Sequence, residues 1–256
     1  MKIAPLFLFL PVLAVAQVPA PDISESHLAA DADRPVSWKQ LLPNILGDEK
    51  QIWLFPLRLG QPRVFIPTAA VIGATAGLVA LDPHDTPYFQ HTSSFSGFNK
   101  VFGGSNTTYG IIAAPVSFYL IGLVRKDSKM EKTALLAGEA IANAEIVTTV
   151  FKDVDRRVRP AAIGSGGSYS DTWFDSKGSF LRGRGSFPSG HTIAAFSIAT
   201  VVARRYPHHR WVPFVAYGLA GVVGFSRVSL SAHFVSDVFM GGALGYSISR
   251  FAVLHQ

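Results

Sequence analysis

The stretch from Ser226 to Asp237 contains a histidine, a carboxylate and an arginine at spacings that suit phosphoryl transfer. His233 and Asp237 are four residues apart, so on a helix they lie on one face, one turn apart. The carboxylate can then hold one imidazole nitrogen and leave the other one basic. Arg227 precedes them and offers a planar set of donors that matches phosphate oxygens. These three residues predict half of a phosphoryl-transfer site.

A cluster of positive charge earlier in the chain can supply part of the other half. Lys152 and Arg159 are seven residues apart, which is two helical turns, so both can point the same way while Pro160 ends the helix. Arg156 and Arg157 lie between them, and for these two we expect structural or surface roles.

The remaining part is the segment 188–192, which reads Pro-Ser-Gly-His-Thr and opens an apolar helix. A helix start offers free backbone N–H groups and the positive end of the helix dipole, which together bind anions. Ser189 can add a hydroxyl donor, and Gly190 lets the backbone approach a ligand closely. His191 would then stand beside a bound phosphate.

Read in chain order, the motifs Lys-x6-Arg-Pro, Pro-Ser-Gly-His and Ser-Arg-x5-His-x3-Asp resemble those of a known superfamily. It is the superfamily of type 2 phosphatidic acid phosphatases and vanadium haloperoxidases, and the resemblance favours its lipid phosphatase branch. Every motif position is filled without substitution, and the resemblance covers roughly residues 100–250.

The resemblance implies a role for each motif residue. His233 would be the nucleophile that forms a phosphohistidine, and Asp237 would orient it. His191 would protonate the leaving oxygen and then activate water. The phosphate oxygens would be bound by a second set of residues, namely Lys152, Arg159, Ser189, Gly190 and Arg227. Three cationic side chains can concentrate the positive charge that phosphoryl transfer needs, so we expect no metal and no cofactor, except vanadate if the protein were a haloperoxidase.

The composition narrows the class of protein. Of the 256 residues, 48% are hydrophobic and 16% charged, and the mean hydropathy of +0.28 predicts several buried or membrane-crossing helices. The net charge of +6 suits an anionic membrane and an anionic substrate. Nucleic acid is not expected as a partner, because no basic stripe interleaves with aromatic residues. The absence of cysteine excludes a thiolate nucleophile.

Apolar stretches of helical length predict an all-α bundle of about five to six apolar helices, membrane-embedded, with the active site at one end. They span residues 64–81, 109–124, 133–151, 192–203, 211–225 and 238–253. Within the third stretch, Glu139, Asn143 and Glu145 should face the bundle interior, because they are costly in lipid. The run 82–85, Asp-Pro-His-Asp, is predicted to end a helix and start a turn rather than to bind a metal.

Three segments divide the chain. Residues 1–16 read as a secretory signal cleaved before Gln17, or as an uncleaved N-terminal anchor. Residues 17–60 are predicted to be a polar linker followed by an amphipathic helix, and residues 61–256 a phosphatase domain. Between the third and fourth apolar stretches, the glycine-rich segment 161–187 is typical of a lid or substrate-binding loop.

The basic turns 125–132 and 204–210 are predicted to be cytoplasmic, which directs the active site toward the periplasm of a bacterial-type inner membrane. If the spans alternate in direction, the span 64–81 must begin on the cytoplasmic side. Cleavage of a secretory signal would instead leave residue 17 and the residues after it on the periplasmic side. Either the signal is retained, or residues 36–81 do not cross simply, or the bundle is a periplasmic or secreted soluble one.

Four hypotheses for the function follow. The first is a metal-independent phosphatase that hydrolyses a lipid phosphate or polyprenyl pyrophosphate through a phosphohistidine. The alternatives are a secreted soluble acid phosphatase of broad specificity, a vanadate-dependent haloperoxidase, and a non-enzymatic binder of lipid phosphates. The intact His233–Asp237 pair and His191 argue against mere binding, for which the cations alone would suffice.

Overall fold

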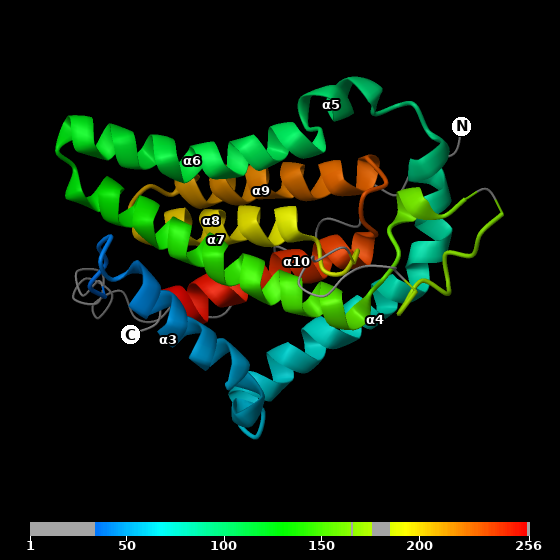
Figure 1. Cartoon of the computed structure of the whole chain (residues 1–256), viewed down its shortest axis with the longest axis horizontal. Coiled ribbons are helices and arrows are strands. Elements are labelled where there is room, and N and C mark those ends of the chain that lie inside the picture. Colours follow the sequence, from blue (N-terminus) through cyan, green and yellow to red (C-terminus); the bar gives the residue numbers. More distant parts are fainter. Residues whose placement is uncertain (1–33, 165, 176–184, 255–256) are drawn as a thin grey trace. The chain divides into compact units, whose positions relative to one another are not determined.

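A computed structural model describes residues 34–164, 166–175 and 185–254, and Figure 1 shows its course. The described residues form eight α-helices and no β-strand, so the prediction of an all-α fold is confirmed. The predicted signal segment, residues 1–16, and the first part of the polar linker lie outside the described residues.

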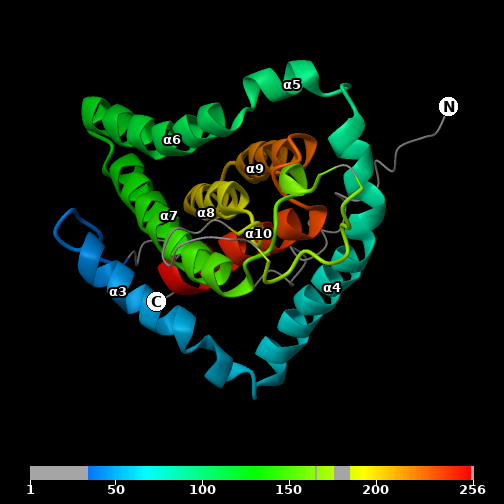
Figure 2. The ribbon, with the colours of Figure 1, turned by 45° about the vertical axis from the view of Figure 1, so that its right-hand side comes forward.

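Helix α8 (Gly190–Arg205) lies at the centre of the bundle and packs most extensively against three other helices, as Figure 2 shows. These neighbours are α7 (Ser128–Asp155), α9 (Trp211–Ser229) and α10 (Val235–Ile248), and α6 (Gly104–Arg125) packs on α7. Small and branched apolar side chains from α7, α8, α10 and the short π-helix after it (Ser249–Val253) fill the core, which comprises Leu136, Ala137, Ala140, Ala144, Val147, Ile193, Val201, Ile248 and Val253. The candidate site residues lie on or next to the ends of these packed helices.

The helices that precede α6 lie outside this central group. The predicted amphipathic helix is α3 (Leu41–Trp53), which packs against α7. It is followed by a 3-10 turn (Phe55–Arg58) and by α4 (Pro62–His91), which contacts α10 and α9. The short α5 (Ser96–Val101) contacts α9. Residues 17–60, predicted to end in an amphipathic helix, thus contain the helix α3.

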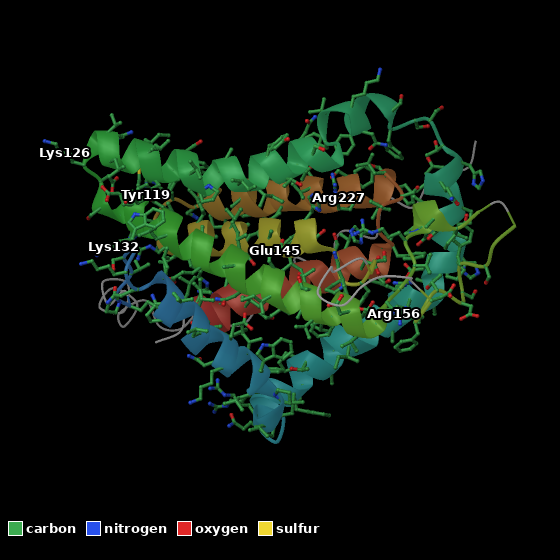
Figure 3. All side chains as sticks on the ribbon, in the orientation of Figure 1. Tyr119, Lys126, Lys132, Glu145, Arg156 and Arg227 are labelled. Carbon is green, nitrogen blue, oxygen red and sulfur yellow. The ribbon has the colours of Figure 1, made fainter. Side chains whose placement is uncertain are left out.

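Polar residues on α7 meet polar residues of α3 inside the protein. Glu139 accepts a hydrogen bond from Asn44 Nδ2 at 2.8 Å, and Asn143 Nδ2 donates to Asp48 Oδ2 at 2.9 Å. The prediction that Glu139 and Asn143 face the interior is confirmed, since both are fully buried. For Glu145 the prediction is wrong, because its side chain is exposed (Figure 3).

Helix α4 extends ten residues beyond the predicted apolar stretch. The prediction that residues 82–85 end a helix is wrong, because α4 continues through Pro83 and Pro87 to His91. A proline inside a helix removes one backbone hydrogen bond, but neighbouring elements can compensate for it. Asp82 is buried in this part of α4 and bonds to other elements, which holds the chain helical there.

Four helical segments are long and apolar enough to cross a membrane. They are α4, α6, α9 and the segment Ser128–Ala162 that contains α7. Large apolar side chains are exposed along α4 and α6, where lipid can cover them, and they include Phe65, Ile66, Ile72, Leu81, Tyr109, Ile112, Val116, Leu120 and Ile121. The described chain therefore has the character of a membrane protein.

The two ends of the bundle differ in their residues. The C-terminal ends of α7 and α9 lie with the N-terminal ends of α8 and α10, because these consecutive helices alternate in direction. The basic turns after α6 and α8 lie at the other end, and Figure 3 shows Lys126 and Lys132 far from Arg227 and Arg156. All catalytic candidates therefore share one end.

Close packing of α10 on α8 depends on Gly245. A Cβ at this position would overlap the carbonyl oxygen of Ile193 and would lie 3.0 Å from Phe196 Cβ. We expect Gly245→Ala to lower the free energy of unfolding by about 1–3 kcal/mol, because the two helices must move apart. Thermal unfolding in detergent measures this loss. Gly218→Ala on α9 is the matched control, since a Cβ there meets nothing within 4 Å; equal stability of the two variants would contradict the prediction.

Candidate active site

The N-terminus of α8 forms one wall of the candidate site. Ser189 is the N-cap, and the first backbone bond of the helix runs from Ile193 N–H to the Ser189 carbonyl oxygen at 2.9 Å. The N–H groups of residues 190–192 come before this bond, at the positive end of the helix dipole. The Ser189 hydroxyl accepts a hydrogen bond from Thr192 at 2.8 Å. The helix start predicted from the Pro-Ser-Gly-His motif is confirmed.

Three cations, Lys152, Arg159 and Arg227, converge on this helix start. Lys152 lies in the last turn of α7 and is buried, and its Nζ lies 3.6 Å from the position of a Cβ on Gly190. Arg159 interacts electrostatically with both of the other two cations. Like charges at such proximity repel one another, so an anion among them would be strongly stabilised.

The backbone around Arg159 differs from the prediction. Helix α7 ends at Asp155, and Arg156 adopts a left-handed conformation with φ 47° that turns the chain. Arg159 lies in extended backbone, with φ −78° and ψ 146°. The prediction that Lys152 and Arg159 lie on one helix is therefore wrong, and it is the turn at Arg156 that brings Arg159 back toward Lys152.

Arg227 is fixed by the start of α6. It lies in the last turn of α9 and is 2% exposed. Its Nη2 donates to the Phe102 carbonyl oxygen at 2.5 Å and to Thr107 Oγ1 at 2.8 Å. Its Nη1 lies 3.8 Å from the position of a Cβ on Gly104. The guanidinium is thus held rigidly at the rim of the site.

His233 and Asp237 meet at the N-terminus of α10. His233 lies two residues before the helix, not within it, and its Nδ1 is 3.4 Å from Asp237 Oδ2. The same oxygen accepts from Phe234 N–H at 3.0 Å and from the Ser186 hydroxyl at 2.5 Å. A carboxylate at Nδ1 favours the tautomer with its hydrogen there, which leaves the Nε2 lone pair free. The expected pair is present, although the turn before α10 and not a helical face creates it.

Burial favours the neutral form of His233. The residue is 3% exposed. This burial, together with the charges of Lys152 and Arg159, lowers the pKa of His233 to about 4 against the opposing effect of Asp237. A neutral imidazole carries the lone pair that a nucleophile needs.

His191 faces α6 from the first turn of α8. Its Nε2 lies 2.9 Å from Thr108 Oγ1 and 3.3 Å from the Gly104 carbonyl oxygen. Because the Thr108 hydroxyl donates to the same carbonyl at 3.0 Å, both groups are placed to accept from an N–H on Nε2. Burial, and next the charge of Arg227, lower the pKa of His191 to about 4. No motif contains Thr108, so the sequence alone does not predict this contact.

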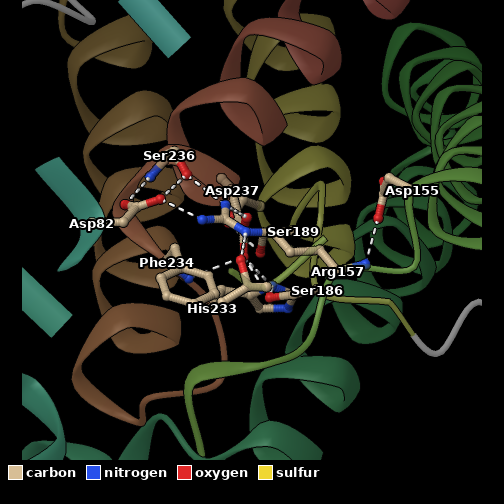
Figure 4. Close-up of polar contacts among 11 residues, drawn as sticks. Asp82, Asp155, Arg157, Ser186, Ser189, His233, Phe234, Ser236 and Asp237 are labelled. Carbon is tan, nitrogen blue, oxygen red and sulfur yellow. Dashed lines mark hydrogen bonds and ion pairs between the residues drawn. The ribbon is translucent and has the colours of Figure 1, made fainter. Parts of the chain in front are cut away.

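Arg157, like Thr108, lies next to the candidate site but is not a motif residue. It is 1% exposed and forms ion pairs with Asp237 at 2.6 Å and Asp82 at 2.7 Å (Figure 4). Its neighbour Arg156 is exposed, and nothing in the run of charges distinguishes the two in sequence. Among the described residues, no three His, Asp or Glu side chains are grouped as ligands for a metal ion.

The arrangement has the parts of a phosphoryl-transfer site. All eight residues predicted from the motifs lie at the same end of the bundle, on or next to the ends of α7, α8, α9 and α10. They combine a neutral histidine with a free ring nitrogen, a second histidine, three cations and a helix N-terminus.

Comparison with known proteins places these residues in a family context. The sequence model of the PAP2 superfamily matches residues 133–256. The chain is 39% identical over 66 residues to a lipid A 1-phosphatase of Porphyromonas gingivalis, covering 25% of this chain and 15% of that one. It is 41% identical over 68 residues to phosphatidylglycerophosphatase B of Bacillus subtilis, covering 23% and 34% respectively. The chain thus aligns with well under half the length of these relatives.

One solved structure is also similar. It is the crystal structure of a transmembrane PAP2-type phosphatidylglycerolphosphate phosphatase from Bacillus subtilis, with 22% sequence identity and a TM-score of 0.43. The alignment covers 82% of this chain and 94% of that chain.

Proposed function

We propose that the protein is a phosphatase of the PAP2 superfamily, whose sequence model matches residues 133–256, and that it hydrolyses the phosphate ester of a membrane lipid. The observation that carries this proposal is the convergence of three cations and the N-terminus of α8 around a neutral, buried His233. A phosphate group bound there would relieve the repulsion among the cations and place its phosphorus beside a nucleophile.

In the first step, His233 attacks the phosphorus atom. The Nε2 lone pair forms the N–P bond while the bond from phosphorus to the lipid oxygen breaks, and Asp237 stabilises the positive imidazole that results. Lys152, Arg159 and Arg227 hold the three equatorial oxygens together with the N–H groups of α8. His191 gives a proton to the departing lipid oxygen. Since the bound phosphate is an anion beside His191, it offsets the cations and lets this imidazole carry the proton.

In the second step, water replaces the histidine. His191, now neutral, takes a proton from a water molecule, whose oxygen bonds to phosphorus as the N–P bond breaks. His233 leaves as a neutral imidazole and inorganic phosphate departs. His233 is the nucleophile in the first step and the leaving group in the second. His191 gives a proton in the first step and regains one in the second.

The position of the site favours a lipid substrate. The described helices include four of membrane-spanning length and composition, and the site lies at one end of the bundle they help to form. A lipid could present its phosphate there while its chains remain among the exposed apolar side chains. The names of the relatives, lipid A 1-phosphatase and phosphatidylglycerophosphatase B, support a lipid phosphate, and a polyprenyl pyrophosphate offers the same terminal group.

We also propose that the site opens to the periplasm from a bacterial inner membrane. The basic turns after α6 and α8 lie at the opposite end of the helices, where the positive-inside rule expects the cytoplasm. A single cysteine introduced at Asp171, in the exposed loop beside the site, would react with a membrane-impermeant thiol reagent in whole cells with a permeabilised outer membrane. Labelling only after the inner membrane is broken would reverse this orientation.

A phosphate-release panel tests the substrate class. The panel contains phosphatidic acid, phosphatidylglycerol phosphate, lipid A and a polyprenyl pyrophosphate in detergent micelles, beside the soluble glycerol 3-phosphate and p-nitrophenyl phosphate. We expect kcat/KM for at least one lipid to exceed that for glycerol 3-phosphate by about 100-fold, because lipid chains contribute binding energy. Equal values would indicate a soluble-type phosphatase of broad specificity, and no release from any compound would refute phosphatase activity.

Removal of divalent metals tests the source of the positive charge. We expect phosphate release to remain within about twofold after treatment with EDTA, because three side-chain cations and a helix dipole stabilise the transferring phosphoryl group. Alkaline phosphatase, treated in parallel, serves as a metal-dependent control. Complete loss of activity that magnesium restores would mean that a metal supplies this charge.

A further inference from the structure

Arg157 is held at a fixed place immediately after α7. Its backbone N–H donates to Asp155 Oδ1 at 2.9 Å, and its carbonyl oxygen accepts from Ser186 N–H at 2.7 Å. The central carbon of the guanidinium lies 4.5 Å from the ring centroid of Trp173 and 3.9 Å from that of Phe234. Both rings make cation–π contacts with the guanidinium, whose N–H groups form hydrogen bonds at its edges.

Those edges bind two carboxylates, as Figure 4 shows. Nη1 donates to Asp237 Oδ1 at 2.6 Å and to the Ser236 hydroxyl at 2.7 Å, and Nη2 donates to Asp82 Oδ2 at 2.7 Å. Both carboxylates are buried, with 1% or less of Asp82 and Asp237 exposed. Arg157 therefore does not point at the phosphate site but at the residue behind the nucleophile.

Asp82 reaches this cluster from a helix outside the part of the chain that matches the superfamily model. Only three residues of α4 are buried, and Asp82 is one of them. It also accepts from Ser236 N–H at 3.2 Å and from the Ser236 hydroxyl by a short hydrogen bond. Ser236 belongs to the first turn of α10, so Asp82 ties the start of α10 to α4.

The contacts of Arg157 and Asp82 determine the orientation of the Asp237 carboxylate. Its Oδ1 is bound by Arg157, and its Oδ2 is the oxygen that faces His233 Nδ1, so the two contacts fix the carboxylate plane. Asp82 takes up part of the charge of the shared guanidinium, which leaves Asp237 able to stabilise a positive imidazole. On the basis of the proposed function, we propose that Asp82 and Arg157 are positioning residues that aim His233 at the phosphate through Asp237.

Other charged groups also face His233. Asp237 interacts with His233 from the first turn of α10, Lys152 from the last turn of α7, and Arg159 from the segment that follows α7. Lys152 and Arg159 are expected to bind phosphate directly. The side-chain hydrogen bonds of Arg157 instead go to Thr172, Ser236 and the two carboxylates of Asp82 and Asp237. Loss of a phosphate-binding cation and loss of a positioning residue should therefore have different signatures.

The kinetic signature separates the two roles. We expect Arg157→Gln to lower kcat about 100-fold with KM within about threefold, because a misaimed nucleophile slows chemistry without weakening the binding of phosphate. Arg157→Lys keeps the charge but cannot reach both carboxylates at once, so we expect about a tenfold loss. Asp82→Asn keeps the shape of the side chain and should give a loss between these two. Lys152→Ala should raise KM as well as lower kcat.

Binding measurements test the inference without turnover. Inorganic phosphate needs only the cations, whereas orthovanadate in its five-coordinate form also needs an aligned imidazole nitrogen. By isothermal titration calorimetry, we expect Arg157→Gln and Asp82→Asn to weaken vanadate binding at least about tenfold and phosphate binding by less than about threefold. Arg156→Gln, at an exposed position beside Arg157, is the matched control for Arg157→Gln. Asp85→Asn, at a half-buried position of α4, is the matched control for Asp82→Asn. They should leave both affinities unchanged.

The outcomes distinguish this inference from the proposed function. A wild-type protein that hydrolyses no phosphate ester would refute the function, while the ratio of vanadate to phosphate affinity would still test the role of Arg157. Equal weakening of the two ligands, or no change in either, in the folded Asp82→Asn and Arg157→Lys proteins would overturn the inference. These two conservative variants keep the test valid if Arg157→Gln does not fold, which near-UV circular dichroism would reveal.

Discussion

We expect His233→Ala to lower the rate of phosphate release from the best lipid substrate by at least about 10⁴-fold. The alanine removes the only group that the proposed mechanism uses to attack phosphorus, and no cysteine exists in the chain to replace it. The three cations and the N-terminus of α8 remain, so the variant should still bind inorganic phosphate. Initial rates with purified protein in micelles, together with phosphate titration, measure both properties.

His84→Ala is the control for this experiment. His84 is an exposed histidine on α4 that lies outside the three motifs, so its loss should leave the rate unchanged. If His233→Ala released phosphate at a rate within about tenfold of the wild-type rate, a water molecule rather than His233 would attack phosphorus, and the two-step mechanism would be wrong.

The second large effect concerns His191, and it should depend on the leaving group. With a lipid phosphate, whose alkoxide departs poorly without a proton, we expect His191→Ala to lower kcat by about 10²–10⁴-fold. With p-nitrophenyl phosphate, the leaving phenolate needs no proton. The first step should then be nearly normal, while the second step, for which His191 activates water, should be slow.

This difference predicts that His191→Ala accumulates phosphoenzyme with the aryl substrate. Rapid mixing should show a burst of p-nitrophenol about equal to the enzyme concentration, followed by slow turnover. Thr108→Val provides a graded comparison, because it removes the hydroxyl beside His191 Nε2 and keeps the imidazole. Equal losses with the lipid and aryl substrates and no burst would show that His191 serves another purpose, such as binding.

Much of the fold follows from local patterns. The apolar stretches predicted the six long helices of the bundle, because the length and composition of a membrane-type helix are local properties. The end of α4 could not be predicted this way. The run Asp82-Pro83-His84-Asp85 has the composition of a turn, and the helix continues because Asp82 bonds to Arg157, 75 residues away in the chain. Tertiary contacts thus overrode the local signal.

In the site, too, some features follow from local sequence and others depend on tertiary contacts. The motifs predicted which end of each helix carries the residues expected to bind phosphate, and the structure brings all of these residues to one end. They did not reveal that Arg159 lies beyond the end of α7, because the left-handed turn at Arg156 has no glycine to mark it. Nor did they single out Arg157, since its two carboxylate partners come from α4 and α10 and only folding brings them together.

In the proposed mechanism His233 becomes phosphorylated, and identifying the phosphorylated residue tests this step most directly. Purified His191→Ala protein is mixed with a ³²P-labelled aryl phosphate, quenched in alkali within milliseconds, digested and analysed by mass spectrometry. We expect one label per protein, stable in alkali and lost in acid as an N–P bond requires, on the peptide that contains His233. The label should be absent when His233 is also replaced by alanine. A label that persists without His233, or one that is stable in acid as a phosphoserine would be, would contradict the mechanism.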